Sequence, residues 1–364
     1  MHSNFFLKSF RILLFPLAIV YWFIILLRNW LYDKNILKSS SFGLPLICVG
    51  NLSVGGTGKS PMVEYLVMHL KNKFRVATLS RGYKRKTSGY ALANENSTAL
   101  EIGDEPMQFH LKFPEVPVAV GEERLEAIPQ LLHDKPTTQC IILDDAFQHR
   151  AIKAGLNILL TDFNNLFTRD FFLPTGDLRD LKSSSKRAEI IIVTKCDPTL
   201  SEDEKKEVIE EINPLPHQHI FFTANRYADP YHIVRNTETI IFAGKPEILL
   251  VTGIANPQPL KDLLQDYSKA YYMMHFPDHH IFTIDDWKEI RKRFNKMEAD
   301  QKYILTTEKD AVRLAKYGAE LNEVPLYVIP LEHYFLFDEG GKFLETVIKF
   351  IESNKPVPAE EFAE

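Results

Sequence analysis

The chain has 364 residues, of which 45% are hydrophobic and 25% are charged, and its formal net charge is −5. The length is sufficient for two domains with separate hydrophobic cores, and the composition is that of an ordinary globular protein. The negative charge argues against general nucleic-acid binding, because no excess of cations is available to neutralise phosphates. Cys48, Cys140 and Cys196 lie in apolar runs without metal-ligand spacing, which indicates reduced, buried thiols and a cytosolic body.

The N-terminal segment between Arg11 and Arg28 is apolar and carries no charged residue. As a helix it would be roughly 24 Å long at about 1.5 Å per residue, which is shorter than a hydrocarbon core of about 30 Å. A buried core helix and a signal peptide are alternatives, but no small-residue cleavage site follows. We expect a membrane-associated helix within residues 1–35 that lies in one leaflet or spans marginally.

A strand, a glycine-dense turn and a helix are predicted in succession over residues 44–70, and the turn ends in Gly58-Lys59-Ser60. Backbone N–H groups can face an anion only where side chains do not block it, and the helix N-terminus adds a positive field. The layout predicts a phosphate-binding loop in which Lys59 contacts phosphates and Ser60 is a Mg²⁺ ligand. Ser53 stands where the common pattern has glycine, and neighbouring glycines could supply the flexibility. The residues expected to contact nucleotide here are Ser53, Gly55, Gly56, Thr57, Gly58, Lys59 and Ser60.

Two pairs of adjacent acids stand at predicted element boundaries. Asp104 and Glu105 precede a predicted helix, where such residues are usually caps, although paired carboxylates can also bind metal or accept a proton. Asp144 and Asp145 close the predicted strand 139–143. A carboxylate at the carboxyl end of a strand beside a phosphate loop is the expected acid for Mg²⁺. The second pair therefore predicts a metal site.

Cations stand in two further loops. Arg81 belongs to a basic run after the predicted strand 74–79, which could either meet phosphate or be solvated. Arg179 lies beside an acid in a Pro/Gly loop, where it could clamp a phosphate or form a surface ion pair.

The sequence Thr194-Lys-Cys-Asp197 is similar to the guanine-reading motif of GTPases. A membrane-associated GTPase that acts as a switch is therefore an alternative function. However, Asp144 and Asp145 are not followed by the Asp-x-x-Gly of a γ-phosphate sensor.

Predicted strands and helices alternate over residues 247–353, after short strands with Pro, Asn and Gly at 216–246. This pattern predicts an α/β fold: a P-loop NTPase-like doubly wound sheet at 36–215 and a second, smaller α/β domain. The tail at 354–364 is expected to fray.

One loop of the predicted smaller domain holds three histidines and an aspartate within residues 275–280. Zinc binding is not favoured, because no Cys or Glu partner stands at ligand spacing. A histidine that works beside a carboxylate across the cleft between the domains is the better functional interpretation, and cleft closure would then assemble the site.

Together these motifs resemble the tetraacyldisaccharide 4'-kinase family, the membrane-bound lipid A kinases of Gram-negative bacteria. The resemblance covers nearly the whole chain, and Ser53 belongs to the family pattern, whereas Lys84 and Asp180 depart from it. The motifs that carry it, in order, are Gly50–Pro61, Arg81–Tyr83, Gly103–Pro106, Asp144–His149, Pro174–Arg179, Thr252–Pro257, Phe276–His280 and Thr306–Asp310.

The resemblance implies transfer of the γ-phosphate of ATP to the 4'-hydroxyl of an acylated glucosamine disaccharide 1-phosphate lipid, which gives lipid IVA. It implies ATP and Mg²⁺ as cofactors, membrane lipids as partners, and an active site on the cytoplasmic face of the inner membrane.

By position, the resemblance implies three catalytic residues: Lys59, Asp104 as acceptor of the hydroxyl proton, and His279, preferred over His280, as its partner. Asp144 would be the Walker-B-like acid that binds Mg²⁺ with Ser60. The residues that would line the nucleotide or sugar-phosphate site are Arg81, Glu105, Asp145, Gln148 and Arg179. A non-catalytic membrane scaffold with a vestigial ATP site is a third possibility, which the intact Lys59, Ser60 and Asp144 disfavour.

Overall fold

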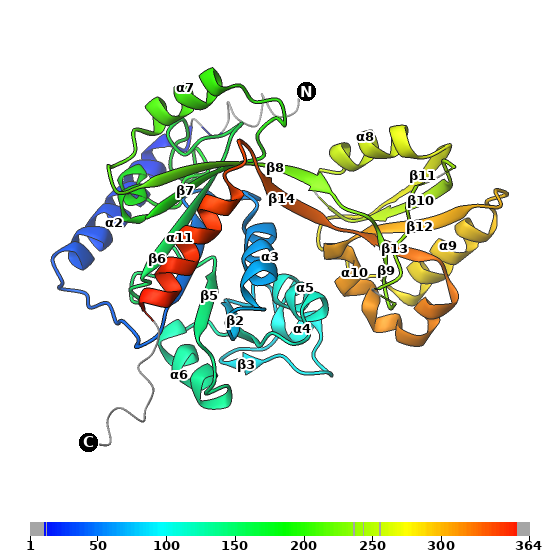
Figure 1. Ribbon diagram of the computed structural model, residues 1–364, viewed down its shortest axis with the longest axis horizontal. Helices are drawn as coiled ribbons and strands as arrows, with labels where there is room; N and C mark the ends of the chain where they lie inside the picture. Colours follow the sequence, from blue (N-terminus) through cyan, green and yellow to red (C-terminus); the bar gives the residue numbers. More distant parts are fainter. Residues whose placement is uncertain (1–10, 12, 236, 243, 255, 355–364) are drawn as a thin grey trace.

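Apolar strand segments separated by amphipathic helices give two mixed sheets, one of nine strands and one of five (Figure 1). The computed structural model describes residues 11, 13–235, 237–242, 244–254 and 256–354. Residues 1–10 and all but the first residue of the predicted tail at 354–364 lie outside the described residues. In order across the larger sheet the strands are β14 (Leu331–Phe335), β8 (His219–Tyr227), β7 (Ile190–Thr194), β6 (Leu156–Asp162), β1 (Leu46–Asn51), β5 (Cys140–Asp144), β2 (Val76–Ser80), β4 (Val118–Val120) and β3 (Ala91–Leu92).

The larger sheet is doubly wound, as predicted. Strands β8 to β4 pair in parallel, and successive residues of β1 enter opposite cores, with Ile47 and Val49 on one face and Leu46 and Cys48 on the other. Helices cover both faces, because a parallel sheet must bury both. The helices of this part are α2 (Phe15–Asp33), α3 (Lys59–Leu70), α4 (Ala99–Ile102), α5 (Asp104–Lys112), α6 (Arg124–Asp134), the 3₁₀ helix η1 (Lys182–Arg187), α7 (Glu202–Ile212) and α11 (Gly340–Ser353).

The smaller sheet confirms a second α/β layer. Its first four strands are parallel, and β9 pairs antiparallel at one edge. In order the strands are β11 (Ala270–His275), β10 (Glu247–Thr252), β12 (Lys302–Thr307), β13 (Leu326–Ile329) and β9 (Tyr231–His232). Its helices are α8 (Gln258–Tyr267), α9 (Ile284–Asn295), α10 (Glu308–Leu314) and the 3₁₀ segment η2 (Ala315–Glu323).

The domain boundaries differ from those expected from the sequence. Strand β8 falls within the expected connection 216–246 but pairs with β7, and β14 falls within the expected smaller domain 247–353 but returns to pair with β8. Phe343 and Val347 of the following α11 are buried against the same core as β1. The alternation of elements does not reveal which sheet a terminal strand and helix will join. The paired strands β8 and β14 lead from the larger sheet toward the smaller domain (Figure 1).

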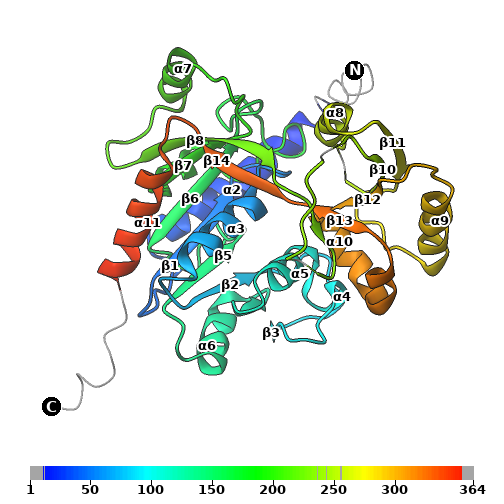
Figure 2. The same cartoon turned by 45° about the vertical axis from the view of Figure 1, so that its right-hand side comes forward.

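Helix α2 is apolar and mostly uncovered. Of its residues only Ala18 and Asn29 are buried, and many of its large apolar side chains are exposed. It is the one helix among the described residues that is long and apolar enough to cross a membrane. It continues beyond the predicted apolar run to Asp33 and lies behind the larger sheet in the second view (Figure 2). Its first turn contains Pro16, where a missing N–H costs no hydrogen bond.

Lys112 is the cation of a buried ion cluster that joins three helices at the seam between the domains. Its Nζ lies 2.6 Å from Glu64 Oε2 on α3 and 2.7 Å from Glu308 Oε1 on α10. Gln108 Nε2 also donates to Glu64 Oε1, at 2.6 Å. Burial and the nearby Glu308 carboxylate raise the pKa of Glu64, and the Lys112 charge opposes that rise. The cation therefore compensates two carboxylates that would otherwise repel each other across the seam.

We predict that Lys112→Met lowers the free energy of unfolding by about 3–5 kcal/mol, because it leaves buried carboxylates without a cation. The matched control is Lys71→Met, which removes the more exposed pair with Glu115 and should cost less than about 1 kcal/mol. Urea unfolding of the detergent-solubilised protein, followed by tryptophan fluorescence, measures both. An equal decrease in the free energy of unfolding for the two variants would show that burial of the Lys112 cluster does not increase its contribution to stability.

Candidate functional site

The phosphate loop links β1 to α3, so that the carboxyl end of a buried strand meets the N-terminus of a helix. Gly55 has φ 114° and Gly58 has φ 86°, conformations that residues with a side chain rarely adopt. Gly58 is also closely packed, because a Cβ there would lie 2.7 Å from His333 Nε2. These two positions account for the need for glycine in the loop.

Ser53 need not be glycine, because its part of the loop is extended. It is buried and forms an isolated antiparallel bridge with Leu178. Beside this bridge the Arg179 amide donates to Leu52 O at 2.8 Å. The segment that contains Arg179 therefore holds the entrance of the phosphate loop, which accounts for the departure from the common glycine pattern.

Asp144 ends β5 and is buried at the carboxyl edge of the sheet. Its Oδ2 accepts a hydrogen bond from Ser80 Oγ at 3.3 Å, whereas its Oδ1 has no partner among the described residues. Burial, with repulsion from Glu105 and Asp145, raises the pKa of Asp144 to about 7. A buried carboxylate oxygen without a partner is suited to bind a cation.

Asp145 has a different environment, between two cations. Its φ is 50°, its Oδ1 lies 3.6 Å from Lys59 Nζ, and its Oδ2 accepts from Arg179 Nη1 at 3.1 Å. Arg179 Nη2 contacts both Asp145 Oδ1 and Asn51 Oδ1. Burial alone would raise the pKa of Asp145, but the Arg179 hydrogen bonds and the Lys59 charge lower it. Lys59 is thus paired with a carboxylate at the position where a nucleotide phosphate would compete for it.

Ser60 follows Lys59 in the first turn of α3, and with Asp144 it offers the oxygen ligands that Mg²⁺ prefers. Among the residues that the structure describes, no group of three His, Cys, Asp or Glu side chains could hold a metal. Mg²⁺ usually completes its shell with water and substrate phosphates. The Ser60 hydroxyl and the unpartnered Asp144 oxygen are therefore each chemically suited to a Mg²⁺ that nucleotide phosphates also hold.

Three further predicted residues lie around this loop. Gln148 Nε2 donates to Asn51 O at 2.7 Å, which ties it to the end of β1. Glu105 is exposed at the start of α5 and interacts electrostatically with Lys59. Arg81 is exposed after β2, and its side chain forms no hydrogen bond or ion pair with another described residue. Arg81 is the predicted residue that the structure connects least to the others.

The structure distinguishes between the two histidines. His279 Nδ1 lies 2.9 Å from Asp104 Oδ2, across the boundary between the smaller and larger domains. His280 Nε2 instead lies 2.9 Å from Asp286 Oδ2, and its ring stacks on Phe276 with centroids 4.7 Å apart. This geometry supports His279 as the partner of Asp104. The predicted pairing across the domains is already formed in this structure.

Two cations at this pair were not anticipated from the sequence. Arg313 on α10 contacts both carboxylate oxygens of Asp104, with Nε 3.1 Å from Oδ1. Lys309 Nζ lies 3.4 Å from His279 Nε2 and 2.7 Å from Asp278 Oδ1. No spacing rule identifies these residues, because Arg313 reaches Asp104 only when α10 packs against α5, and Lys309 meets His279 only through the folding of the smaller domain.

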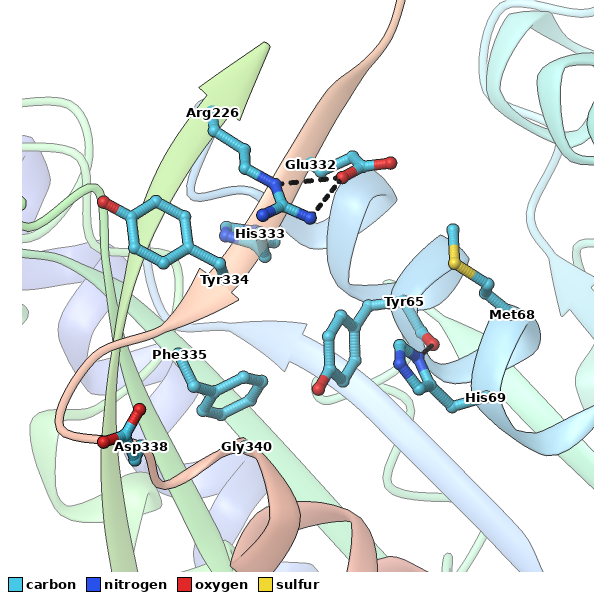
Figure 3. Close-up of a pocket in the computed structure, with 10 residues that line it drawn as sticks. All are labelled: Tyr65, Met68, His69, Arg226, Glu332, His333, Tyr334, Phe335, Asp338 and Gly340. Carbon is cyan, nitrogen blue, oxygen red and sulfur yellow. Dashed lines mark hydrogen bonds and ion pairs between the residues drawn. The ribbon is translucent and has the colours of Figure 1, made fainter. Parts of the chain in front are cut away.

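His333 is a third residue that the sequence analysis missed. It is buried on β14, and its Nε2 donates to Gly58 O at 2.9 Å, which supports the phosphate loop from the interdomain strands. Burial lowers the pKa of His333 to about 4, so the ring stays neutral. Figure 3 shows it in the wall of a cavity of about 420 Å³ beside Tyr65 and Phe335. That cavity contains none of the predicted site residues, so it is separate from the candidate site.

Comparisons with known proteins agree on one family. The family model described as Tetraacyldisaccharide-1-P 4'-kinase matches residues 10–351. The chain is similar to the tetraacyldisaccharide 4'-kinase of Bacteroides thetaiotaomicron, with 42% identity over 354 residues that cover 94% of this chain and 93% of the relative. It is 46% identical to that of Flavobacterium johnsoniae over 346 residues, which cover 94% and 98%.

A solved structure shares the fold. The crystal structure of LpxK from Aquifex aeolicus in complex with ATP superposes with a TM-score of 0.74 at 28% identity, and the match covers 94% of this chain and 99% of that one. The predicted fold class is thereby confirmed.

We predict that Gly58→Ala weakens ATP binding about tenfold or more, since a left-handed alanine costs about 1–2 kcal/mol and its Cβ would meet His333. Gly43→Ala is the matched control, because nothing lies within 4 Å of its Cβ position and it precedes the loop. Isothermal titration with ATP measures both affinities. Unchanged affinity for Gly58→Ala would show that the loop tolerates a side chain there.

Proposed function

The chain belongs to the tetraacyldisaccharide-1-P 4'-kinase family, and we infer from this that it transfers the γ-phosphate of ATP to the 4'-hydroxyl of tetraacyldisaccharide 1-phosphate. The product is lipid IVA, an intermediate of lipid A biosynthesis. The observation that carries this conclusion is the family match over residues 10–351, which includes every predicted site residue.

We propose that the nucleotide phosphates bind at the phosphate loop, where backbone amides and Lys59 face them. Lys59 would then leave its ion pair with Asp145 and pair with the phosphates instead. Arg179 would remain paired with Asp145 and balance its negative charge. Ser60 and Asp144 would hold Mg²⁺, which when bound neutralises charge on the transferred phosphoryl group. The remaining residues proposed to line the nucleotide or sugar-phosphate site are Ser53, Gly55, Gly56, Thr57, Gly58, Arg81, Glu105 and Gln148.

Asp104 would accept the proton of the 4'-hydroxyl. As the hydroxyl oxygen forms a bond to the γ-phosphorus and the bond to ADP breaks, the proton passes to the Asp104 carboxylate. Phosphoryl transfer depends more on in-line positioning than on base strength, so an ionised, well-oriented carboxylate is sufficient. His279, hydrogen-bonded to Asp104 Oδ2, would orient it.

The GTPase alternative loses support from the contacts of its motif. Thr194 Oγ1 donates to Thr57 O at 2.9 Å, Lys195 pairs with Asp162 at 2.7 Å, and Asp197 accepts hydrogen bonds from Thr199 within its own turn. These contacts give three of the four motif residues a structural role that does not require guanine.

We propose that α2 places the enzyme on the cytoplasmic face of the inner membrane, because its acylated substrate cannot leave the bilayer. Leu17, Val20, Phe23 and Ile24 are each more than half exposed on this helix. Exposed apolar side chains on a helix of this length are typical of membrane-embedded or membrane-lying segments. Membrane lipids would then be partners of the protein as well as the matrix of its substrate.

We predict that purified protein with Mg-ATP and disaccharide 1-phosphate lipid in detergent yields a product with one added phosphate. His279→Gln should lower kcat about 100-fold or more, as expected for loss of an acid–base partner. His280→Gln, whose ring faces Asp286, is the matched control and should keep kcat close to the wild-type value. Mass spectrometry and release of ADP measure the turnover.

Asp104→Ala should abolish turnover in this assay while retaining most ATP affinity. A near-normal kcat for Asp104→Ala would show that another group accepts the proton. Hydrolysis of GTP in the absence of lipid, without phosphorylation of the disaccharide, would instead support the alternative function as a GTPase switch.

We predict that Val20→Lys combined with Phe23→Lys lowers binding to phospholipid vesicles about tenfold or more, since each introduces a charge into the exposed apolar face. Met68→Lys, at an exposed apolar position on α3, is the control and should bind like the wild type. Vesicle flotation measures the bound fraction. Undiminished binding of the double variant would assign membrane attachment to another surface.

A further inference from the structure

Arg313 is a buried cation at the boundary between the two domains. Its side chain is 5% exposed, and its Nε and Nη2 contact the two carboxylate oxygens of Asp104. Its Nη1 lies 3.4 Å from Asp310 Oδ1. Asp310 is fully buried and accepts a hydrogen bond from the Gly253 amide at 2.9 Å. The guanidinium is therefore held in place from the smaller domain, while the carboxylate that it binds belongs to the larger one.

His279 lies at the same carboxylate. Its Nδ1 is 2.9 Å from Asp104 Oδ2 and 3.0 Å from Arg313 Nη2, and its Nε2 is 3.4 Å from Lys309 Nζ. Asp104 therefore accepts hydrogen bonds from two N–H groups of Arg313, and the His279 ring contacts both members of this ion pair.

Several other charged groups surround Asp104 and its two partners. Asp104, His279 and Arg313 line a cavity of about 580 Å³ between α5, α10 and residues 95–100. The further charged groups around Asp104 and its two partners are Glu105, which follows it on α5, Asp278, Lys309 and Asp310 of the smaller domain, and Lys84, Glu95 and Lys316 in the cavity wall. Arg313 is the cation among them that contacts both Asp104 oxygens directly.

We propose that Arg313 is a positioning residue for the proton-accepting carboxylate: from the smaller domain it fixes the orientation of Asp104 and keeps it ionised. The proposal rests on the proposed function, in which Asp104 accepts the hydroxyl proton. It also links that carboxylate to domain docking, because the guanidinium reaches Asp104 only while α10 lies against α5.

The charge balance at Asp104 supports this role. Burial on its own would raise the pKa of Asp104, but the hydrogen bonds and charge of Arg313, with those of His279, lower it. An acid whose pKa is lowered remains ionised from neutral into acidic pH. Removal of the guanidinium leaves the burial effect opposed by His279 alone, so the pKa of Asp104 should rise.

The test compares the pH dependence of kcat/KM for the lipid in wild-type protein, Arg313→Met and Arg313→Lys. On the acidic side of the profile, kcat/KM falls as Asp104 becomes protonated, and we call this part the acid limb. For Arg313→Met the acid limb should move to higher pH by about one unit or more. Arg313→Lys keeps the positive charge but loses the bidentate contact with the Asp104 carboxylate, so the acid limb of this variant should move less. Arg226→Met, which removes an exposed pair with Glu332, is the control and should leave the limb in place. A purely structural role for Arg313 would lower kcat at every pH without moving the limb, and that result overturns the proposal.

A second measurement needs no turnover. Protein labelled with ¹³C at aspartate carboxylates, with the Asp104 resonance assigned by its loss in Asp104→Asn, gives the titration midpoint of Asp104 directly. The midpoint should be higher in Arg313→Met than in the wild type. If the wild type fails to phosphorylate the lipid, the proposed function fails, and the midpoint still decides the role of Arg313. An unchanged midpoint in a folded Arg313→Met variant refutes the proposal even where the kinase assay succeeds.

Discussion

The antiparallel contact between α5 and α10 is the constraint on which the site depends. Asp104 begins α5 and meets Arg313 near the end of α10, whereas Lys112 ends α5 and meets Glu308 at the start of α10. Each charge is favourable at its own helix end, and each pairs with the opposite charge of the other helix. The same packing therefore fixes the relative position of the two domains and the surroundings of Asp104.

This arrangement suits phosphoryl transfer rather than strong base catalysis. A carboxylate at a helix N-terminus, with an arginine on both oxygens, stays ionised but gains little basicity. Such a group can orient a hydroxyl and take its proton late, when the attacking oxygen is already bonded to phosphorus. The phosphate loop is also held at both ends. Ser53 forms a β-bridge with Leu178 at its start, and His333 Nε2 donates a hydrogen bond to Gly58 O at its end. The groups proposed to react, which come from separate elements, are thus already held in place by contacts within the protein.

The parts of the candidate site that can be recognised from the sequence are those whose geometry is local in the chain. The glycine turn before Lys59 and the acid at the end of β5 are recognisable because neighbours in sequence supply the geometry. Arg313 and His333 were not predictable, since each acquires its role from a helix or strand that packs against the loop from a distant part of the chain. The return of β14 to the larger sheet was missed for the same reason: alternation of strands and helices specifies layers but not which sheet receives the last strand.

Helix α2, the proposed membrane helix, is joined to the phosphate loop through polar contacts. Tyr21 OH donates to Arg179 O at 3.0 Å, and Arg28 Nη2 donates to Gln148 O at 2.6 Å. Arg179 compensates Asp145, and Gln148 is bonded to Asn51 O at the end of β1. The helix that would lie in the lipid is therefore two hydrogen bonds from the phosphate loop. If the acyl chains of the substrate hold its headgroup at the bilayer surface, as the proposed function requires, these hydrogen bonds would set the height at which the γ-phosphate is presented.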